Sequence, residues 1–446
     1  MKSKKFSLVI SKPIKRFRKK IIVDSDKSLS IRSFLIGSIS QGVSIAENVL
    51  ESEDVFSTIY CLRKLGIKIE KTGKIYKIFG KGLGSLKIKN QNKLNLGNSG
   101  TLARLIIGIL ATTPKIKVLL HGDNSLNKRS MKKLILLMNQ FGAEFLPNNK
   151  FTFPLRLISS SYPISINYEA GTSAQLKSAV ILAGLNSFGK TIITEKQYSR
   201  DHTEIMLSKN KQALNINSSK FKTISVNGKS YLNKFKIKIP GDPSSAAFFT
   251  ALAILRKNSY LKIKNVGLNP TRIGYYNLLK KSGAKINFLN VKKVNNEKVG
   301  DILVKSSKLK PIKASSDYYL NTTDEYPILF VISALTNGIS KFNGIHGLSN
   351  KESDRIKEMQ KILKQIGIRS IYKNNSLKIY GNKKIKIDKR KIYVPNLGDH
   401  RICMSATVLA LITGVKTVIK NFETVNTSSP NFLNKIKFLG GKFEKK

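Results

Sequence analysis

A diverged unit recurs six times along this 446-residue chain, and this repetition limits the possible folds more than any other feature of the sequence. Each copy begins with a polar, turn-forming cluster, followed by an apolar helix rich in small residues, a β-like run, a polar loop, a second helix and a short strand after a glycine. The copies begin at Asp26, Gly97, Gly171, Gly241, Asp324 and Gly398. Because solenoid repeats are shorter, roughly 20 to 45 residues, we expect two domains of three units each.

The second copy shows the unit most clearly. After an opening cluster at residues 97–101, we expect a helix through Ala111, a strand over 116–120, a loop over 122–130 and a second helix through Gln140. Short connections between strands and helices favour α/β units with parallel strand pairing. The sequence therefore predicts an α/β fold.

The expected domain boundary lies in the polar stretch 209–238, where Asn, Ser and Lys interrupt the periodicity and the third copy lacks a clear second helix. A second crossing is expected near residues 12–20, which leaves a first strand over residues 6–11 to pack with the C-terminal half. We therefore predict one domain over residues 21–238 with repeats one to three, and another over residues 1–20 plus 239–446 with repeats four to six.

The net charge of +54 first suggests a nucleic-acid-binding protein, because 80 Lys and Arg residues stand against 26 Asp and Glu residues. The basic residues are spread along the whole chain, however, and the chain has no tryptophan on which bases could stack. Only 14 of the 80 basic residues are arginine. We interpret most lysines as compositional drift, and we expect arginine to persist where bidentate contacts to phosphate or carboxylate require it.

Cysteine usage and the N-terminus favour a cytoplasmic protein without a membrane anchor. Cys61 and Cys403 lie far apart, with no spacing typical of a metal site or a disulfide framework. The apolar run near the N-terminus, at residues 6–10, is much shorter than a signal-peptide core, and no segment approaches a membrane span. We expect no metal.

The polar clusters that open the units are expected to bind anions. Ser, Thr, Asp and Gly at a helix start leave backbone N–H groups available, and the helix dipole adds positive potential there. One such start is only a cap, but several starts here also carry Arg, Lys or Gln, which capping does not require. Six of the 14 arginines lie in these opening clusters or in the polar motifs that follow them in the same units, namely Arg32, Arg104, Arg129, Arg200, Arg355 and Arg401.

Seven motifs occur in order along nearly the whole chain: DKSLSIRS, GNSGTLAR, RDHTE, GDPSSAAFF, DEYPI, NKESDR and GDHR. Together they resemble the signatures of the EPSP synthase family of enolpyruvyl transferases (3-phosphoshikimate 1-carboxyvinyltransferases). The resemblance implies a two-domain inside-out α/β barrel built from six βαβαββ repeats, with the active site in the cleft between the domains. The number of repeats found above agrees with this fold.

The resemblance also implies a reaction. Members of this family transfer the enolpyruvyl (1-carboxyvinyl) group of phosphoenolpyruvate to the 5-hydroxyl of 3-phosphoshikimate by addition and elimination, and release phosphate, on the route to chorismate and the aromatic amino acids. No cofactor is implied, and the partners are these two small substrates, with no specific nucleic acid and no membrane. A monomer is expected.

The same resemblance implies the roles of individual residues. Asp324 would be the general base towards the 5-hydroxyl, Glu352 would be the acid for the methylene carbon, and Lys27 and His400 would assist. The implied 3-phosphoshikimate site comprises Lys27, Ser28, Arg32, Ser173, Ala174, Gln175, Arg200, Asp324 and Lys351. The implied phosphoenolpyruvate site comprises Lys27, Gly100, Arg129, Gln175, Arg355 and Arg401. Taken alone, either carboxylate is more simply a surface group.

The chain departs from the family pattern at several positions. Asp24-Ser25 replaces Pro-Gly, Ser130 replaces a proline, Asn350 replaces an arginine or valine, and Thr427 stands where many members carry a lysine. This last change puts one phosphoenolpyruvate contact in doubt. Gly100 lies where a bulkier residue blocks the inhibitor glyphosate in resistant relatives, so inhibition is expected.

Three alternative functions compete with this one. An enolpyruvyl transferase acting on UDP-N-acetylglucosamine would need a cysteine in residues 124–130, where none occurs. A basic RNA-binding protein and an inactive paralogue stay open, although the retained carboxylates and arginines argue against the second. Residues 184–191 match the GxxxxGK[ST] phosphate-loop pattern, but we expect a helix before them and a strand after them, which inverts the required context, and therefore no ATP use.

Overall fold

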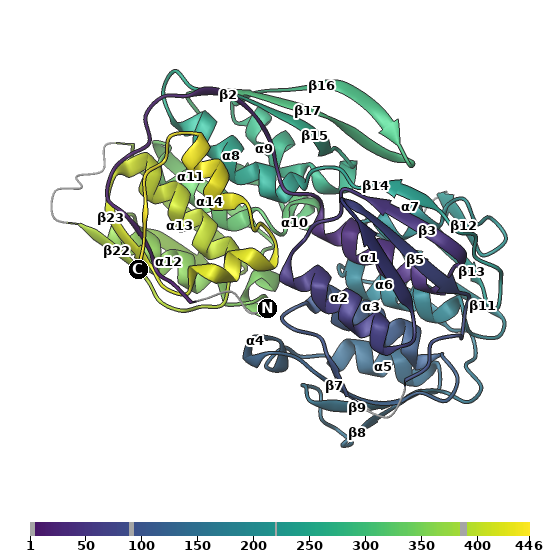
Figure 1. Ribbon diagram of the computed structural model, residues 1–446. Helices are drawn as coiled ribbons and strands as arrows, with labels where there is room; N and C mark the ends of the chain where they lie inside the picture. Colours follow the sequence, from purple (N-terminus) through teal and green to yellow (C-terminus); the bar gives the residue numbers. More distant parts are fainter. Residues whose placement is uncertain (1–4, 89–92, 219–220, 384–389) are drawn as a thin grey trace. The chain divides into compact units, whose positions relative to one another are not determined.

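The computed structural model of the chain describes residues 5–88, 93–218, 221–383 and 390–446 (Figure 1). Its internal contacts divide it into two compact units. We call Ser25–Ile239 the central unit, and Met1–Asp24 together with Pro240–Lys446 the terminal unit. A division by contacts does not test independent folding, so the domain assignment from the sequence stays a prediction.

The described residues form six four-stranded sheets that share one topology. In the second repeat, β6 (Lys93–Asn95) pairs in parallel with β7 (Lys117–His121). Strand β7 then pairs antiparallel with β9 (Leu155–Ile158), which pairs antiparallel with β8 (Glu144–Leu146). The other five sheets repeat this order of one parallel and two antiparallel pairings. This repetition confirms the six units expected from the sequence.

The central unit contains three of these sheets. Besides the sheet of the second repeat, its strands, in sheet order, are β14 (Lys236–Lys238), β3 (Gln41–Glu47), β5 (Ile75–Lys81) and β4 (Lys68–Thr72), then β10 (Asn167–Ala170), β11 (Lys190–Glu195), β13 (Lys222–Asn227) and β12 (Leu214–Ser218). Its helices are α1 (Lys27–Ile39), α2 (Glu53–Lys64), α3 (Gly100–Ala111), α4 (Asn124–Asn127), α5 (Lys132–Gln140), α6 (Ala174–Gly184) and α7 (His202–Leu207).

The terminal unit contains the other three sheets. Their strands, in sheet order, are β16 (Lys285–Val294), β17 (Glu297–Lys305), β15 (Tyr260–Gly267) and β2 (Arg18–Ile22), then β18 (Lys313–Ala314), β19 (Gly338–Asn343), β21 (Ser376–Gly381) and β20 (Ser370–Lys373), then β22 (Lys391–Val394), β23 (Lys416–Ile419), β1 (Leu8–Ile10) and β24 (Glu444–Lys445). Its α-helices are α8 (Pro243–Leu255), α9 (Gly274–Lys281), α10 (Tyr319–Thr322), α11 (Tyr326–Ala334), α12 (Arg355–Gln365), α13 (His400–Thr413) and α14 (Phe432–Phe438). Its 3-10 helices are η1 (Pro270–Arg272), η2 (Ser316–Tyr318), η3 (His346–Asn350) and η4 (Phe422–Thr427).

The first helix of each repeat forms the core of its unit, and the sheets lie outside it (Figure 1). Helices α1, α3 and α6 of the central unit, and α8, α11 and α13 of the terminal unit, are buried on nearly every face. Most positions of these helices carry apolar or small residues, and buried polar ones such as Arg32 and Lys177 have polar or charged partners. Small residues allow close packing: a Cβ added at Gly108 of α3 would lie 2.4 Å from the Ala179 carbonyl oxygen of α6. Among the described residues, no helix combines the length and the apolar character that crossing a membrane requires.

Three sheets are completed by strands that come from a distant part of the chain. In one of them, β2 pairs in parallel with β15 of the terminal unit. Strand β14 pairs in parallel with β3 and completes the first sheet of the central unit. Strand β1 pairs antiparallel with both β23 and β24 in the terminal unit. The expected packing of the first strand with the C-terminal half is therefore confirmed.

The local structure corrects two expectations. The loop over 122–130 contains the short helix α4, because the Asp123 Oδ1 atom accepts a hydrogen bond from the Leu126 backbone N–H (2.8 Å) and Leu126 is buried. The stretch 209–238 contains β12, β13 and β14, because apolar residues in alternate positions, such as Ile224 and Val226, face the core through the polar sequence.

The phosphate-loop pattern at residues 184–191 has the inverted context that we expected. Helix α6 ends at Gly184 and β11 begins at Lys190, so a helix precedes the pattern and a strand follows it. A phosphate-binding loop of this type instead follows a strand and presents its N–H groups at the start of a helix. The match is therefore a chance one.

Candidate functional site

The residues singled out from the sequence lie at or beside helix starts in both units. In the central unit, Lys27 begins α1, Gly100 begins α3 and Ala174 begins α6. In the terminal unit, Arg355 begins α12 and His400 begins α13. The first turn of a helix has unpaired N–H groups and the positive end of the helix dipole, so each position suits an anionic ligand.

At the start of α1, Arg32 is held by side chains from three helices. Its Nη1 atom donates to the Ser28 hydroxyl one turn earlier, and its Nε atom donates to the Thr203 Oγ1 atom of α7 (2.8 Å). Its Nη2 atom donates to the Ser178 Oγ atom of α6 (3.2 Å). The residue is only 3% exposed, so these contacts fix its guanidinium beside Ser28.

Lys27 has a carboxylate partner from the same unit. Its Nζ atom lies 2.9 Å from Asp54 Oδ2 of α2, and Asp54 is buried. Asp26 caps α1, because its Oδ1 atom accepts from the Leu29 backbone N–H at 2.8 Å. The cap leaves the Lys27 side chain partly exposed at the positive end of the helix.

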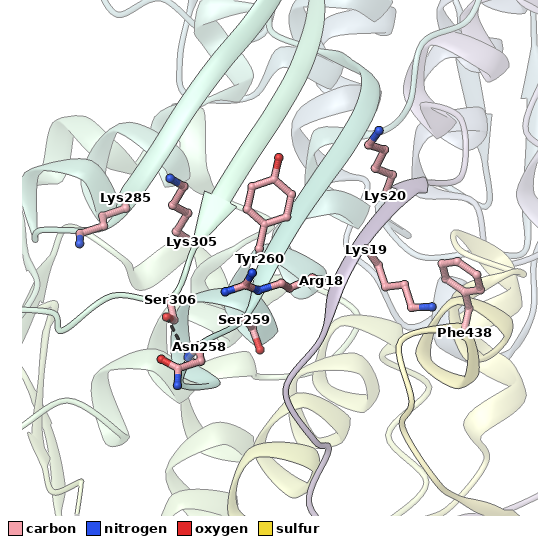
Figure 2. Close-up of a pocket in the computed structure, with 10 residues that line it drawn as sticks. All are labelled: Arg18, Lys19, Lys20, Asn258, Ser259, Tyr260, Lys285, Lys305, Ser306 and Phe438. Carbon is pink, nitrogen blue, oxygen red and sulfur yellow. Dashed lines mark hydrogen bonds between the residues drawn. The ribbon is translucent and has the colours of Figure 1, made fainter.

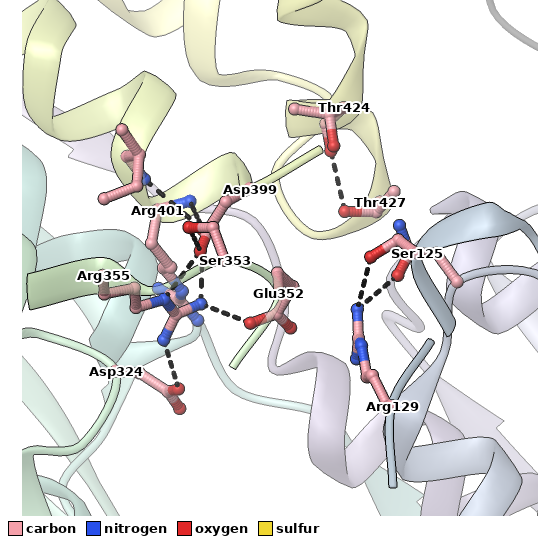
Figure 3. Close-up of polar contacts among 12 residues, drawn as sticks. Ser125, Arg129, Asp324, Glu352, Ser353, Arg355, Asp399, Arg401, Thr424 and Thr427 are labelled. Atoms are coloured by element: carbon pink, nitrogen blue, oxygen red, sulfur yellow. Dashed lines mark hydrogen bonds and ion pairs between the residues drawn. The ribbon is translucent and has the colours of Figure 1, made fainter. Parts of the chain in front are cut away.

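At the start of α3, two arginines crowd the backbone of Gly100. A Cβ atom added there would lie 2.9 Å from the Nη1 atoms of both Arg104 and Arg129. Arg129 Nη2 donates to Asn98 Oδ1 (2.5 Å). It also donates to Ser125 Oγ (3.3 Å; Figure 3). A glycine at this position therefore allows two guanidinium groups to approach the first turn of the helix.

The start of α6 lies next to the start of α3. Ser173 caps α6, since its Oγ atom accepts from the Leu176 N–H, and Ala174 and Gln175 form the first turn. Gln175 Nε2 donates to Thr101 Oγ1 of α3 at 3.0 Å. Arg200 follows β11 in the loop before α7 and is half-buried. The structure thus brings Gln175 together with the Gly100 region inside the central unit.

In the terminal unit, Arg355 joins three carboxylates (Figure 3). Its Nε atom lies 2.9 Å from Asp399 Oδ2, and its Nη2 atom lies 2.7 Å from Glu352 Oε2 and 3.3 Å from Asp399 Oδ1. Its Nη1 atom lies 3.7 Å from Asp324 Oδ1, which is an ion-pair distance and too long for a hydrogen bond. The two carboxylates singled out for proton transfer therefore face the same guanidinium.

The burial of Arg355 and its charged neighbours act in opposite directions on its pKa. Burial alone would lower the pKa of this guanidinium, but the carboxylates of Asp399, Glu352 and Asp324 raise it above its ordinary value. Arg355 is 1% exposed, whereas the Asp324 and Glu352 side chains are about one-fifth exposed. The cation is therefore permanent, and the two carboxylates can reach a ligand.

Asp399 connects the starts of α12 and α13. Besides contacting Arg355, its Oδ1 atom accepts from the Arg401 and Ile402 backbone N–H groups at 2.9 and 3.4 Å. The Arg401 guanidinium lies 6.0 Å from the Phe248 ring centroid, and its Nε and Nη1 atoms are buried without a hydrogen-bond partner among the described residues. Buried charged donors of this kind suit an anionic ligand. His400, the first residue of α13, is also buried.

Two residues of these arrangements were not identified as site residues from the sequence. Arg104 lies one turn after Gly100 and contacts its carbonyl oxygen through Nη1 (3.1 Å), and its place among the six motif arginines was the available signal. Asp399 lies inside the GDHR motif but was not assigned a role. Lys351, which was assigned one, is half-buried between η3 and α12.

The departure at Asp24 has a structural explanation within the terminal unit. Its Oδ2 atom accepts from Ser429 Oγ (2.7 Å) and the Asn431 backbone N–H (3.2 Å), and its Oδ1 atom accepts from Asn431 Nδ2 (2.8 Å) and Lys435 Nζ (3.3 Å). The carboxylate is 3% exposed. Asp24 therefore anchors the segment that leads into α14.

Two further departures also have local partners. Ser130 lies just before α5, and its Oγ atom accepts from the Lys132 N–H at 3.3 Å. Thr427 is buried, and its hydroxyl donates to the Thr424 carbonyl at 2.7 Å within η4. The position where many relatives carry a lysine is thus occupied by a neutral side chain that serves the local turn.

A separate cavity of about 870 Å³ lies in the terminal unit (Figure 2). It is lined by Arg18, Lys19, Lys20, Asn258, Ser259, Tyr260, Lys285, Lys305, Ser306 and Phe438. None of the residues singled out from the sequence lines it. Its lysine side chains point in different directions, and Lys19 lies over the Phe438 ring, 5.0 Å from its centroid. The cavity therefore lacks the convergent donors seen at the helix starts.

Metal ligands do not gather anywhere in the part of the chain that the structure describes: no three His, Cys, Asp or Glu residues are placed to hold an ion. Cys61 and Cys403 are both buried free thiols. Burial raises the pKa of the Cys61 thiol to about 12, although the nearby Lys64 opposes the rise.

The arrangement described above can therefore do two things chemically. The helix starts can bind anions, and the carboxylates of Asp324 and Glu352 can transfer protons.

Comparison with known proteins finds a family to which the chain is similar over nearly its whole length. Residues 11–436 match the family model described as EPSP synthase (3-phosphoshikimate 1-carboxyvinyltransferase). The 3-phosphoshikimate 1-carboxyvinyltransferase of Zymomonas mobilis is 38% identical over 431 residues, covering 95% of this chain and 94% of that protein. The protein of the same description from Caldicellulosiruptor saccharolyticus is 39% identical over 422 residues, covering 94% and 96%.

Solved structures agree with these sequence matches. An EPSP synthase from Acinetobacter baumannii is similar with a TM-score of 0.84 and 34% identity, covering 99% of this chain and all of that one. The enolpyruvyl transferase NikO from Streptomyces tendae, at 13% identity and a TM-score of 0.75 over 99% of both chains, shows likeness of fold alone. The predicted inside-out α/β barrel fold is thereby confirmed.

Proposed function

The chain belongs to the EPSP synthase family, and on this premise we propose how its residues carry out the family's reaction. It is a transferase with 3-phosphoshikimate 1-carboxyvinyltransferase activity, in the shikimate pathway to chorismate and the aromatic amino acids. Its substrates are phosphoenolpyruvate and 3-phosphoshikimate. Each substrate carries a phosphate and a carboxylate, so its binding needs several fixed positive charges.

The assignment of residues rests on Arg355 and Arg401, two arginines at helix starts that have buried donor atoms without hydrogen-bond partners among the described residues. Arg401 has two buried donor atoms without hydrogen-bond partners among the described residues, and Arg355 Nη1 makes no hydrogen bond to them. A buried charged donor left in this state costs about 1 to 3 kcal/mol or more. Phosphate or carboxylate oxygens supply the missing acceptors.

For 3-phosphoshikimate, we assign the starts of α1 and α6 to the phosphate. Arg32 and Ser28 form one face of α1, and Lys27 lies at its positive end. The residues assigned to this substrate are Lys27, Ser28, Arg32, Ser173, Ala174, Gln175, Arg200, Asp324 and Lys351. The contact of Arg32 with Ser28, and the capped start of α6, support this assignment for the central unit.

For phosphoenolpyruvate, we assign the start of α3 and the arginines of α12 and α13. Arg129 beside Gly100 offers a fork of N–H donors, and planar guanidinium groups bind phosphate and carboxylate in a bidentate manner. The residues assigned to this substrate are Lys27, Gly100, Arg129, Gln175, Arg355 and Arg401. These residues divide between the two units, and the expected active site between domains stays a prediction.

We assign proton transfer to Asp324 and Glu352. In the addition step, the 5-oxygen bonds to C2 of phosphoenolpyruvate, Asp324 takes the hydroxyl proton, and Glu352 donates a proton to the methylene carbon. In the elimination step, the methyl group returns a proton to the Glu352 carboxylate and the double bond re-forms. The bond between C2 and the phosphate oxygen breaks, and the proton that Asp324 took leaves with the phosphate. Lys27 and His400 assist. The shared contact of both carboxylates with Arg355 supports this pairing, because one cation sets the position of both.

We also propose that the protein acts as a monomer in the cytoplasm. Two buried free thiols, which fit a reducing compartment, support this location. Size-exclusion chromatography with light scattering tests the monomer: a mass near that of one chain supports it, and twice that mass contradicts it.

Phosphate release tests the activity and distinguishes it from the alternatives. Purified protein is supplied with phosphoenolpyruvate, with and without 3-phosphoshikimate, in moderate salt that suppresses nonspecific binding. Release that requires both substrates is expected. No release from folded protein would favour an inactive paralogue, and salt-sensitive RNA retention would then favour a nucleic-acid-binding role.

A further inference from the structure

A buried cluster of four charged side chains lies in the central unit, and the proposed mechanism makes no use of it. We call Lys177, Glu195, Glu204 and Lys222 the buried ion cluster. Lys177 Nζ lies 2.8 Å from Glu195 Oε1 and 2.6 Å from Glu204 Oε1. Lys222 Nζ lies 3.5 Å from Glu195 Oε2 and 3.2 Å from Glu204 Oε1. The Lys177 and Glu195 side chains are fully buried, and Glu204 is 1% exposed.

Such a cluster is a poor means of stabilising a fold. Removing charges from water costs several kcal/mol per ion, and well-packed apolar residues often replace a buried ion pair without loss of stability. The charges do persist here: burial alone would raise the pKa of Glu195, but Lys177 and Ser199 lower it below its ordinary value. The carboxylates of Glu204 and Glu195 likewise raise the pKa of Lys222 against the effect of burial. A role in fixing geometry explains the cluster better.

The cluster forms hydrogen bonds with both backbone polar groups of Ser199, its N–H and its carbonyl oxygen. Glu195 Oε1 accepts from the Ser199 backbone N–H (2.9 Å) and from its hydroxyl (2.5 Å). Lys177 Nζ donates to the Ser199 carbonyl oxygen at 3.5 Å. These contacts fix both peptide groups that flank Ser199. The second of these peptide groups leads directly into Arg200.

A second set of contacts links the same elements to Arg32. Ser178 follows Lys177 on α6, and Thr203 precedes Glu204 on α7. Arg32 donates to Thr203 Oγ1 (2.8 Å) and to Ser178 Oγ (3.2 Å), and Thr203 Oγ1 donates to Ser178 Oγ (2.8 Å). The ion pair between Lys177 and Glu204 therefore sets the spacing between the two hydroxyls that hold the Arg32 guanidinium.

We propose that the buried ion cluster is a positioning device that aims Arg32 and Arg200 at the phosphate of 3-phosphoshikimate, with Lys177 and Glu195 as its central positioning residues. This inference rests on the proposed assignment of both arginines to that phosphate. It predicts that the cluster governs recognition of the phosphate group, and that phosphoenolpyruvate binding does not depend on it.

The test measures how strongly the protein prefers 3-phosphoshikimate to shikimate, which lacks the phosphate. Calorimetric titration with each ligand gives the two affinities for the wild type and for Glu195→Gln. The substitution keeps the size of the side chain but removes the charge that orients Lys177 and Ser199. We expect the preference to fall about 10- to 100-fold, as when a ligand is misplaced by about an ångström. The KM for phosphoenolpyruvate should stay within about twofold of the wild-type value.

A matched control removes another carboxylate of the same unit. Glu169 of β10 pairs with Lys196 at 2.6 Å on the surface, with both side chains more than half exposed. Exposed pairs contribute about 0 to 1 kcal/mol, so Glu169→Gln should change neither ligand affinity. Thermal unfolding of both variants shows that the comparison is made on folded protein.

Each outcome is decisive. A folded Glu195→Gln variant that keeps the wild-type preference for the phosphorylated ligand would show that the cluster is only structural. If Glu195→Gln does not fold, Lys222→Gln provides the test within the cluster, because it removes the partly exposed cation that contacts Glu195 and Glu204. A wild-type protein without any preference for 3-phosphoshikimate would overturn the assignment of the arginines instead, and with it the proposed substrate site.

Discussion

Replacing Gly100 by alanine should weaken the binding of phosphoenolpyruvate without lowering the stability of the fold. The added Cβ would lie 2.9 Å from the Nη1 atoms of Arg104 and Arg129, closer than ordinary contacts allow. Both atoms are ends of flexible side chains, so the guanidinium groups should move and the backbone should not. Gly100 begins α3 without a positive φ, and alanine is favoured over glycine within helices by up to about 1 kcal/mol.

The expected rise in the KM for phosphoenolpyruvate follows from the contacts that Arg129 would lose. Its bonds to Asn98 Oδ1 (2.5 Å) and Ser125 Oγ (3.3 Å) hold the guanidinium in place. Hydrogen bonds of charged groups contribute about 1.5 to 3 kcal/mol each, and a factor of ten in affinity corresponds to about 1.4 kcal/mol. Loss of one productive contact to phosphoenolpyruvate should therefore raise its KM about 10- to 100-fold.

Steady-state kinetics with either substrate varied, together with urea unfolding, provides the assay. For Gly100→Ala we expect a raised KM for phosphoenolpyruvate with unchanged or slightly higher stability. Gly267→Ala is the matched control, because a Cβ at Gly267 meets its nearest atoms at an ordinary 3.6 Å. A Gly100→Ala variant with wild-type KM for phosphoenolpyruvate would refute the placement of this substrate at the start of α3. Loss of several kcal/mol of stability would show that the backbone, and not the arginines, had moved.

Four further predictions concern catalysis, inhibition and stability. Asp324→Ala and Glu352→Gln should each lower kcat by about 10²- to 10⁴-fold with small changes in binding, because proton-transfer groups act mainly in the transition state; near-normal turnover in both would remove them from the mechanism. Glyphosate should inhibit competitively with phosphoenolpyruvate, because Gly100 leaves the space that a larger residue would fill; full activity at millimolar inhibitor would contradict this. Asp24→Ala should lower the free energy of unfolding by about 3 kcal/mol in urea titrations, since it leaves buried donors without their acceptor; a loss below about 0.5 kcal/mol would be inconsistent with the anchoring role. The pKa of Glu195 is lowered in the fold, so its ionised form adds stability that is lost as the pH falls below its ordinary value of 4.5; Glu195→Gln should flatten this acid limb, and an unchanged limb in unfolding experiments would contradict the ionised cluster.

Much of the fold could be predicted from the sequence because its signals are local. The apolar helices, the glycine-led strands and the polar clusters recur within each unit of 70 to 83 residues, so six weak patterns support one another. The polar clusters that begin at Asp26, Gly97 and Gly398 indicated where α1, α3 and α13 begin, because capping residues act within one turn. Local periodicity did not predict the strands within residues 209–238. Lysine and asparagine at exposed positions there obscure the alternation of buried and exposed side chains in β12 and β13.

The persistence of arginine in a lysine-rich chain likewise points to the candidate site. Guanidinium geometry cannot be replaced by an ammonium group at a bidentate contact, so composition alone carries this information. The assignment of roles to Asp324 and Glu352 depended on the family resemblance, because an isolated carboxylate in a sequence does not differ from a surface one.

The contacts between residues far apart in the sequence could not be predicted from the sequence and are known only from the tertiary structure. Arg355 meets Asp399 across 44 positions, and Asp24 meets Ser429 across 405, without any local pattern that marks these pairs. Lys177 is one of 66 lysines and resembles the exposed ones in the sequence, yet it is fully buried between two glutamates. Partners of this kind are set by how helices and sheets pack, and packing depends on the whole chain, whereas periodicity and capping depend on neighbours a few residues away.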